Sequence, residues 1–117
     1  TAVTRLGEKA AIPRGQLAEG VAGALAVFRA TLAARAEDHV RGSMAVAQDL
    51  AAVAAAVENG VALAAWCGDR ECADALEEKV NASVLGTGVR SPYVTEETGA
   101  CVICGREGKT ALVGRAY

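Results

Sequence analysis

Apolar side chains recur at steps of three and four residues through the first third of the chain. The repeating positions are Leu17, Val21, Leu25, Phe28, Leu32, Ala36 and Val40. This spacing places them on one face of a helix of about six turns, while Arg29 and Glu37 fall off that face. Because no cationic face accompanies the apolar one, we interpret the segment as a surface helix that packs on a small sheet, not one that lies on a membrane.

Polar and glycine residues mark where this helix ends and where a second one begins. Gly42 and Ser43 end the long helix. Asp49 has a side chain that is favoured at a helix N-cap, because its carboxylate can accept hydrogen bonds from the first turn. Asn59 and Gly60 both tolerate the left-handed conformation that ends a helix, so we expect them to close the second helix.

The rest of the chain predicts a third helix and a small sheet. Residues 61–66 form a short apolar run that is typical of a buried strand, and residues 71–80 repeat apolar side chains at four-residue steps. Residues 81–100 are rich in Gly, Ser and Thr, so we expect mostly loop there, with at most one short strand. Residues 110–113 predict a final strand.

Taken in order, these elements predict the α+β class and one domain with a connector before it. Helices come first, and a small, mostly antiparallel sheet follows them. Residues 1–15 contain two glycines and a proline and show little periodicity, so we interpret them as a connector. We expect residues 16–117 to form one domain, with a helical part at 16–60 and a cysteine-containing sheet part at 61–117.

The chain has four cysteines, arranged as two close pairs: Cys67 with Cys72, and Cys101 with Cys104. Two short loops that each carry a pair of thiolates can place four sulfur ligands at the corners of a tetrahedron, as in structural zinc sites. Such a site leaves no position open for water, so it stabilises a fold and does not activate a nucleophile. An all-thiolate tetrahedral site can also hold iron.

Disulfide bonds and redox chemistry are the alternatives to a metal. Two disulfides require an oxidising compartment, and the N-terminal residues lack the basic, apolar and small-residue pattern of a signal peptide. A redox pair at Cys101 and Cys104 requires a helix N-terminus after a strand and at least one low-pKa thiol free of metal. Glycines and the β-prone segment 110–113 follow these cysteines instead. The residues therefore favour a structural metal.

Charge and hydropathy narrow the choice of partners and compartment. Lys and Arg number 12 against 14 Asp and Glu, so no net positive field attracts nucleic acid. Asp49 interrupts the alanine-rich run 44–57, and we therefore expect no transmembrane helix and no membrane partner. An acidic composition without a signal-peptide pattern predicts the cytoplasm.

The residues that most often carry catalysis do not form a recognisable site. The sequence contains no Gly-x-x-x-x-Gly-Lys loop, no His-Glu-x-x-His helix and no Gly-x-Ser-x-Gly elbow. The single histidine, His39, stands beside Glu37 and Asp38, and we expect it to be solvated at the end of the long helix. Glu77 and Glu78 are adjacent, so on a helix they point in different directions. We therefore predict a non-catalytic chain.

Several stretches, in order along the chain, resemble one family. They are the Gly7-Glu-Lys9 turn with the long helix after it, Trp66-Cys-Gly-Asp-Arg-Glu-Cys72 with the strand before it, Cys101-Val-Ile-Cys-Gly105, and the terminal Gly114-Arg-Ala-Tyr117. Together they resemble the C-terminal zinc-binding extension of prolyl-tRNA synthetases of the archaeal and eukaryote-like type, which some bacteria also carry.

The resemblance implies roles for particular residues. In that family a class II catalytic domain activates L-proline with ATP and Mg and transfers it to tRNA(Pro), and an anticodon-binding domain recognises the tRNA. The extension follows as a domain with a structural zinc. Carried over by motif, Cys67, Cys72, Cys101 and Cys104 would be the zinc ligands. The C-terminal carboxylate of Tyr117 would reach back toward the catalytic domain.

On this reading the chain is a non-catalytic, stabilising fragment of a proline-tRNA ligase. Its partners would be the catalytic and anticodon-binding domains, the latter joined through residues 1–15, and the intact enzyme would be a cytoplasmic homodimer. The alternative is a free-standing zinc-ribbon module that binds nucleic acid or a protein partner. Such a module would cluster Arg and Lys with aromatic side chains around the metal. The flanking residues here are instead of mixed charge: Asp69, Arg70, Glu71, Arg106 and Glu107.

Overall fold

The computed structural model describes residues 1–88 and 90–115, and these fall into two compact units that divide after His39. The first unit is a short hairpin followed by most of a long helix. Its elements are β1 (Ala2–Val3), β2 (Lys9–Ala10), a 3-10 turn (Arg14–Gln16) and α1 (Leu17–Gly42). The two strands pair antiparallel, and Gly7 takes a φ of 84° in the turn between them. This left-handed conformation favours glycine.

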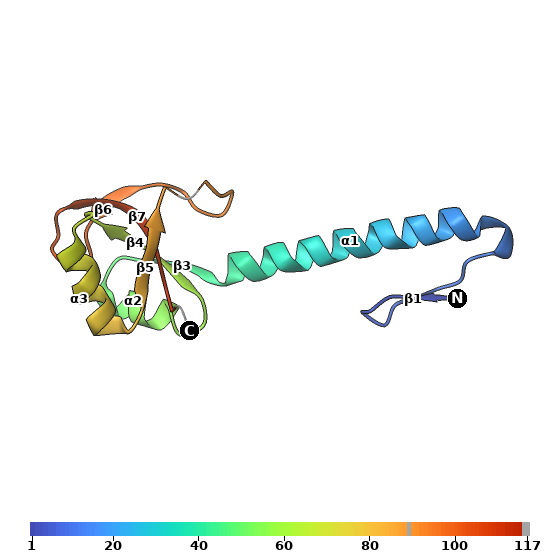
Figure 1. Ribbon diagram of the computed structural model, residues 1–117, viewed down its shortest axis with the longest axis horizontal. Coiled ribbons are helices and arrows are strands. Elements are labelled where there is room, and N and C mark those ends of the chain that lie inside the picture. Colours follow the sequence, from blue (N-terminus) through green and yellow to red (C-terminus); the bar gives the residue numbers. More distant parts are fainter. Residues whose placement is uncertain (89, 116–117) are drawn as a thin grey trace. The chain divides into compact units, whose positions relative to one another are not determined.

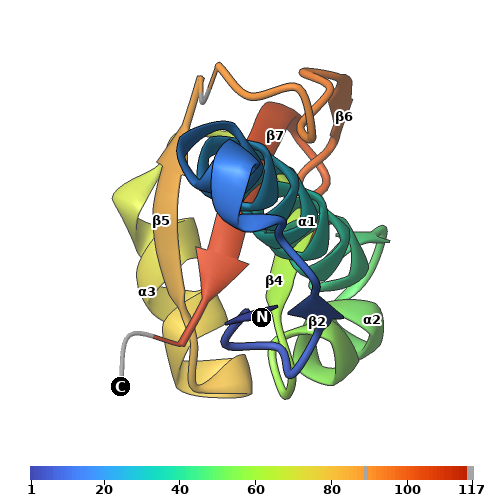
Figure 2. The ribbon, with the colours of Figure 1, turned by 90° about the vertical axis from the view of Figure 1, so that its right-hand side faces the viewer.

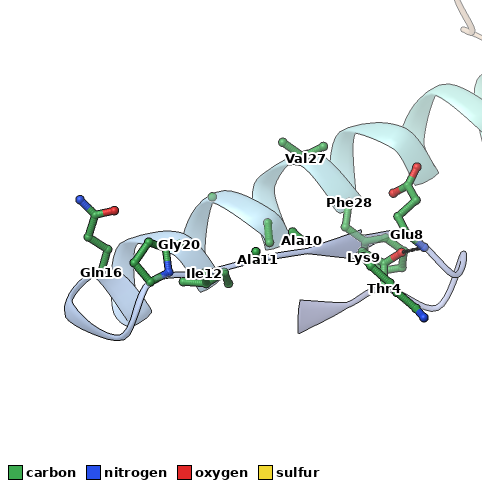
Figure 3. Close-up of a pocket in the computed structure, with 13 residues that line it drawn as sticks. Thr4, Glu8, Lys9, Ala10, Ala11, Ile12, Gln16, Gly20, Val27 and Phe28 are labelled. Atoms are coloured by element: carbon green, nitrogen blue, oxygen red, sulfur yellow. Dashed lines mark hydrogen bonds between the residues drawn. The ribbon is translucent and has the colours of Figure 1, made fainter. Parts of the chain in front are cut away.

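An apolar groove lies between α1 and the segment that leads into it (Figure 3). The segment packs so closely on the helix that a side chain at Gly20 would clash with Ile12. The groove has a volume of about 450 Å³, and its lining is mostly apolar, with Ala24, Val27 and Phe28 contributed by the helix. The residues predicted to be a connector therefore have a defined structure of their own.

The predicted long helix is confirmed, and its apolar face is open. The structure describes all 26 residues of α1, and none of them is buried. Four side chains of the apolar stripe have large exposed fractions: Leu17 53%, Val21 42%, Leu25 50% and Leu32 43%. Exposed apolar side chains in a row of this length usually mark a surface that another part of a protein covers.

The same helix is the one segment of the described chain that could span a membrane by length and composition. Residues Arg14–Gly42 contain an 18-residue window with a mean hydropathy of 1.4. Core helices of soluble proteins and signal sequences share this length and composition. Sequence reasoning tested only the run 44–57 for this property and overlooked the longer candidate. The expectation of no membrane partner stays a prediction.

The second unit, from Val40 onward, is built on a five-stranded mixed sheet (Figure 1). The strands are β3 (Met44–Ala47), β4 (Val61–Trp66), β5 (Ser83–Thr87), β6 (Thr98–Ala100) and β7 (Glu107–Gly114). The order is β3-β4-β7-β5, and β6 pairs with the first residues of β7. Among the strands that the structure describes, only β3 and β4 pair in parallel. Figure 2 shows β5 and β4 on opposite sides of β7.

Two helices, α2 (Leu50–Ala56) and α3 (Arg70–Val80), pack on the sheet and form the core with it. Both begin at an aspartate N-cap, of which only Asp49 was predicted from the sequence. An Asp49 carboxylate oxygen lies 2.8 Å from the amide nitrogen of Ala52, and an Asp69 carboxylate oxygen lies 3.1 Å from the amide nitrogen of Glu71. The main buried side chains come from the two helices, the residues just after them, and strands β4 and β7: Val53, Val57, Ala62, Ala64, Leu76, Val80, Ala82 and Val113. The α+β class is confirmed.

Three strands of the five-stranded sheet were missed or underestimated from the sequence. Residues 44–47 lie in an alanine-rich run and were not assigned a strand, yet they form β3 beside β4. The start of that pairing is tight, because the Ser43 carbonyl accepts a hydrogen bond from the Val61 amide at 2.8 Å, and a side chain at Gly60 would clash with Ser43. The expectation of at most one short strand in 81–100 was wrong: β5 and β6 both lie there, and β5 contains a bulge.

Candidate metal centre

Three of the four cysteines lie beside the end or the start of a strand, and the fourth lies at the start of a helix. Cys67 directly follows β4, and Cys72 lies in the first turn of α3. Cys101 directly follows β6, and Cys104 lies in the turn that leads into β7. Cys72 and Cys101 are buried, Cys67 is half-buried and Cys104 is exposed. Two segments separated by residues 73–100 therefore meet at one end of the sheet.

The sulfur atoms of these cysteines form one cluster. All four Sγ atoms lie within 4.8 Å of one another, and those of Cys67 and Cys104 are 3.7 Å apart. A tetrahedral ion bound by sulfur at about 2.3 Å places its ligands about 3.8 Å apart. A disulfide requires about 2.05 Å, and all four thiols are free in this structure. The cluster can therefore hold a metal ion, and its geometry does not support the disulfide alternative.

Tight turns with backbone hydrogen bonds shape the second cysteine pair. Gly105 takes a φ of 73°, and its amide donates to the Cys101 carbonyl at 2.9 Å. The Cys101 amide donates in turn to the Arg106 carbonyl at 2.8 Å. The Val102 amide donates to the Ala65 carbonyl of β4 at 3.1 Å, which ties this turn to the strand that carries the first pair. Gly68 has a φ of 85°, so a left-handed glycine directly follows a cysteine of each pair, Cys67 in one and Cys104 in the other.

A glycine in β7 permits close contact with the first cysteine turn. A side chain at Gly108 would clash with the backbone of Trp66 and Cys67. Gly108 is buried, so its neighbours have little room to move away. The absence of a side chain at this position therefore helps to bring the two cysteine pairs together.

An ion pair spans the two cysteine turns. Nη2 of Arg106 lies 2.6 Å from Oδ2 of Asp69, and Nε of Arg106 lies 3.3 Å from Sγ of Cys104. Nη2 also lies 3.7 Å from Sγ of Cys67. Sequence reasoning treated both charged residues as part of a mixed set without a role. The sequence signal that could have predicted this ion pair is the placement of Asp69 two residues after the first cysteine and of Arg106 two residues after the last.

The surroundings of the thiols shift their pKa values in different directions. The Arg106 side chain, followed by the Arg106 backbone amide, lowers the pKa of Cys104 to about 6. Burial raises the pKa of Cys72 to about 12, with the neighbouring thiols adding to the effect. Burial also opposes ionisation of Cys101, but the amides of Cys104, Ile103 and Cys67 outweigh it and lower the pKa of Cys101. A bound cation would favour the thiolate form of all four cysteines.

These differences predict an order of reaction with iodoacetamide in the metal-free chain, at a temperature low enough for the sheet unit to remain folded. We expect Cys104 to be modified first, because it is exposed and its pKa is about 6. Its rate should fall as the pH drops through that value, since the thiol replaces the thiolate. Cys72 should react last, because it is buried and its pKa is about 12. Peptide mapping by mass spectrometry at a series of pH values measures both rates. Modification of Cys72 ahead of Cys104 would contradict the prediction.

The other residues considered from the sequence do not join the cluster. His39 is an exposed residue of α1, as expected. Glu77 accepts a hydrogen bond from the Ser83 hydroxyl at 2.8 Å, and its neighbour Glu78 is exposed, so they form no carboxylate pair. Strand β7, not a helix, follows Cys104, which argues against a redox pair. Tyr117 lies outside the described residues.

Comparisons with known proteins agree with the resemblance seen in the sequence. The family described as "Prolyl-tRNA synthetase, C-terminal" matches residues 51–117. The chain is 42% identical over 113 residues to the proline-tRNA ligase of Methanocorpusculum labreanum, covering 97% of this chain and 24% of the relative. It is 38% identical over 121 residues to proline-tRNA ligase 2 of Rhodococcus jostii, covering 98% and 24%.

A solved structure shares the fold. The crystal structure of prolyl-tRNA synthetase from Cryptosporidium parvum matches with a TM-score of 0.76 at 21% identity, over 95% of this chain and 24% of that one. This chain thus spans about a quarter of the length of the relatives it matches. The family match over residues 51–117, together with archaeal relatives such as that of Methanoregula boonei at 41% identity over 99% of the chain, shows that the chain belongs to the prolyl-tRNA synthetase family and corresponds to its C-terminal region.

Proposed function

We propose that this chain is the non-catalytic, zinc-binding C-terminal domain of a prolyl-tRNA synthetase. The intact enzyme would attach L-proline to tRNA(Pro) with ATP and Mg, in the cytoplasm and as a homodimer. The observation that carries the role of the domain is the cluster of four Sγ atoms within 4.8 Å of one another. The cluster joins the ends of β4 and β6 to the starts of α3 and β7, so an ion there would hold four elements in place.

The chemistry of the cluster favours zinc and a structural role. Its candidate ligands are Cys67, Cys72, Cys101 and Cys104, which form a complete tetrahedral set of soft donors. With all four positions taken by protein sulfur, no water can bind the ion and become a nucleophile. Iron is the other ion that an all-thiolate tetrahedral site accepts. The ion would contribute its binding free energy to folding, because the unfolded chain does not present the four sulfurs together.

The exposed apolar stripe of α1 and the groove beside it support a role in joining domains. Side chains such as Leu17 and Leu25 are about half exposed, at 53% and 50%. The relatives are about four times as long as this chain, so most of a parent enzyme is not included here. We propose that residues 1–15 connect to an anticodon-binding domain and that this domain covers the stripe. Tyr117 would direct its carboxylate toward the catalytic domain.

The electrostatics around the cysteines favour this role over a nucleic-acid-binding ribbon. Phosphate binding requires several unpaired cations on one surface. The guanidinium of Arg106 is already paired with Asp69 at 2.6 Å, and Arg70 pairs with Asp74 at 3.8 Å. These two arginines beside the cysteine turns therefore carry little net positive charge for a phosphate backbone.

Metal content and thiol titration test the proposal directly. Elemental mass spectrometry of the purified chain should find one zinc per chain. A thiol reagent should detect free cysteines only after denaturation in chelator, when all four should appear. One iron per chain would keep the site but overturn the choice of metal. Absence of metal after purification and after reconstitution with Zn²⁺ would overturn the metal site.

A further inference from the structure

We infer that Arg106, held in place by Asp69, retains the metal ion by contacting its sulfur ligands from outside the coordination sphere. The inference rests on the proposed metal site. In this positioning role, Arg106 would slow the release of the ion. It would also close the exposed edge of the cluster to solvent.

The contacts of Arg106 reach both cysteine turns. Its Nε lies 3.3 Å from Sγ of Cys104, and its Nη2 lies 3.7 Å from Sγ of Cys67. These are the exposed and the half-buried members of the set. The guanidinium therefore lies on the side of the cluster from which a chelator or water would approach. The two buried members, Cys72 and Cys101, are shielded by the fold itself.

Asp69 holds this guanidinium in a defined orientation. One carboxylate oxygen of Asp69 lies 3.1 Å from the Glu71 amide nitrogen and caps α3, while the other lies 2.6 Å from Nη2 of Arg106. The Asp69 carbonyl accepts a hydrogen bond from Nε1 of Trp66 at 3.0 Å. The carboxylate is thus fixed by the start of α3, and the Asp69 backbone is fixed by Trp66 at the end of β4. A residue held at these two points gives Arg106 a rigid partner.

The charge of a loaded site explains why such a cation matters. Four thiolates and one divalent ion carry a formal charge of about −2. Hydrogen bonds from a cation to the sulfurs reduce the repulsion among them and orient them toward the ion. The nearby Arg70 instead forms an ion pair with Asp74, one turn further along α3, at 3.8 Å. The geometry thus distinguishes two arginines that look alike in the sequence.

The test compares zinc release from four variants of the whole chain with release from the unsubstituted chain. Arg106→Gln removes the cation, and Arg106→Lys keeps the charge but cannot reach both sulfurs and the carboxylate together. Asp69→Asn keeps an oxygen that can cap α3 but loses the charge that holds Arg106. Arg70→Gln is the matched control, since the Arg70 side chain is 93% exposed and pairs with Asp74. Release into excess chromogenic chelator is followed in native buffer.

We expect Arg106→Gln and Asp69→Asn to release zinc about 10- to 100-fold faster. Arg106→Lys should be intermediate, and Arg70→Gln should match the unsubstituted chain. In the cobalt-substituted protein, the sulfur-to-metal charge-transfer band should shift in Arg106→Gln and stay in place in Arg70→Gln. Such a shift reports a lost hydrogen bond to sulfur, which a merely looser fold would not produce.

Two results would overturn the inference in distinguishable ways. If the unsubstituted chain binds zinc and Arg106→Gln releases it at the same rate, Arg106 has no such role and the metal site stands. If the unsubstituted chain binds no metal, the metal site fails and the inference fails with it. Circular dichroism of each zinc-loaded variant verifies folding. If Arg106→Gln does not fold, unchanged release from Arg106→Lys and Asp69→Asn overturns the inference equally.

Discussion

Removal of the metal is expected to unfold the sheet unit while leaving much of α1 helical. At a free zinc concentration about 1,000-fold above its dissociation constant, binding stabilises the folded chain by about 4 kcal/mol. For a domain of this size, losing that amount corresponds to a fall in Tm of roughly 15–30 °C. The cluster joins the two segments that flank residues 73–100, so a bound ion would hold the ends of this loop together. Without the ion, folding must offset the entropy of closing the loop by other contacts.

Hydrogen exchange measured by mass spectrometry would locate the effect. Amides of β4 (Val61–Trp66) and β7 (Glu107–Gly114) should lose protection in chelator, because these strands pair with each other and lead into or out of the cysteine turns. Amides of α1 up to His39 belong to the other unit and should change less. Re-addition of Zn²⁺ should restore protection. Retention of sheet protection in strong chelator would contradict a structural metal.

Replacement of Leu76 by alanine is expected to have the second largest effect. Leu76 is fully buried in α3 and packs in the same cluster as Val53 and Val113. A cavity at such a site costs about 2–5 kcal/mol. Leu76 also lies four residues after Cys72 on the same helix face, so a shift of α3 should weaken metal binding. Urea unfolding of the zinc-loaded chain measures the loss of stability, and competition with a chelator measures the loss of metal affinity.

The matched control for this substitution is Leu85→Ala. Leu85 lies in the bulge of β5 and is 54% exposed, so the same chemical change should alter stability by only about 0.5 kcal/mol. Equal losses for the two variants would show that Leu76 does not contribute to the core as described. A large loss for Leu76→Ala with unchanged metal affinity would show that α3 does not position Cys72.

The helices were predictable because their signals are local. The spacing of apolar side chains predicted α1, and Asp49 predicted the start of α2, where its carboxylate caps the first turn. Residues 61–66 were correctly predicted to form a strand. Each of these signals acts through neighbours within a few residues, so no knowledge of distant partners was needed.

The missed strands depend on partners that are distant in the chain. Residues 44–47 have an alanine-rich sequence that suits a helix as well as a strand, and they form β3 because β4 pairs with them in parallel. Residues 83–87 contain Gly86 and read as loop, yet β7 provides an edge to which they bind. The hydrogen bonds of an edge strand come from another segment, and residue type alone does not reveal them.

By itself, the sequence determined the α+β class, the three helices and the four cysteines that can hold a metal, because composition, periodicity and motif spacing are properties of short segments. The family followed from the resemblance of several motifs to known sequences. Only the tertiary structure decided the order of the strands, the burial of Cys72 and Cys101, and the ion pair of Asp69 with Arg106. These features require residues some thirty or more positions apart to meet at one end of the sheet. Their meeting depends on the pairing of β4 with β7, which buries apolar side chains beneath α2 and α3.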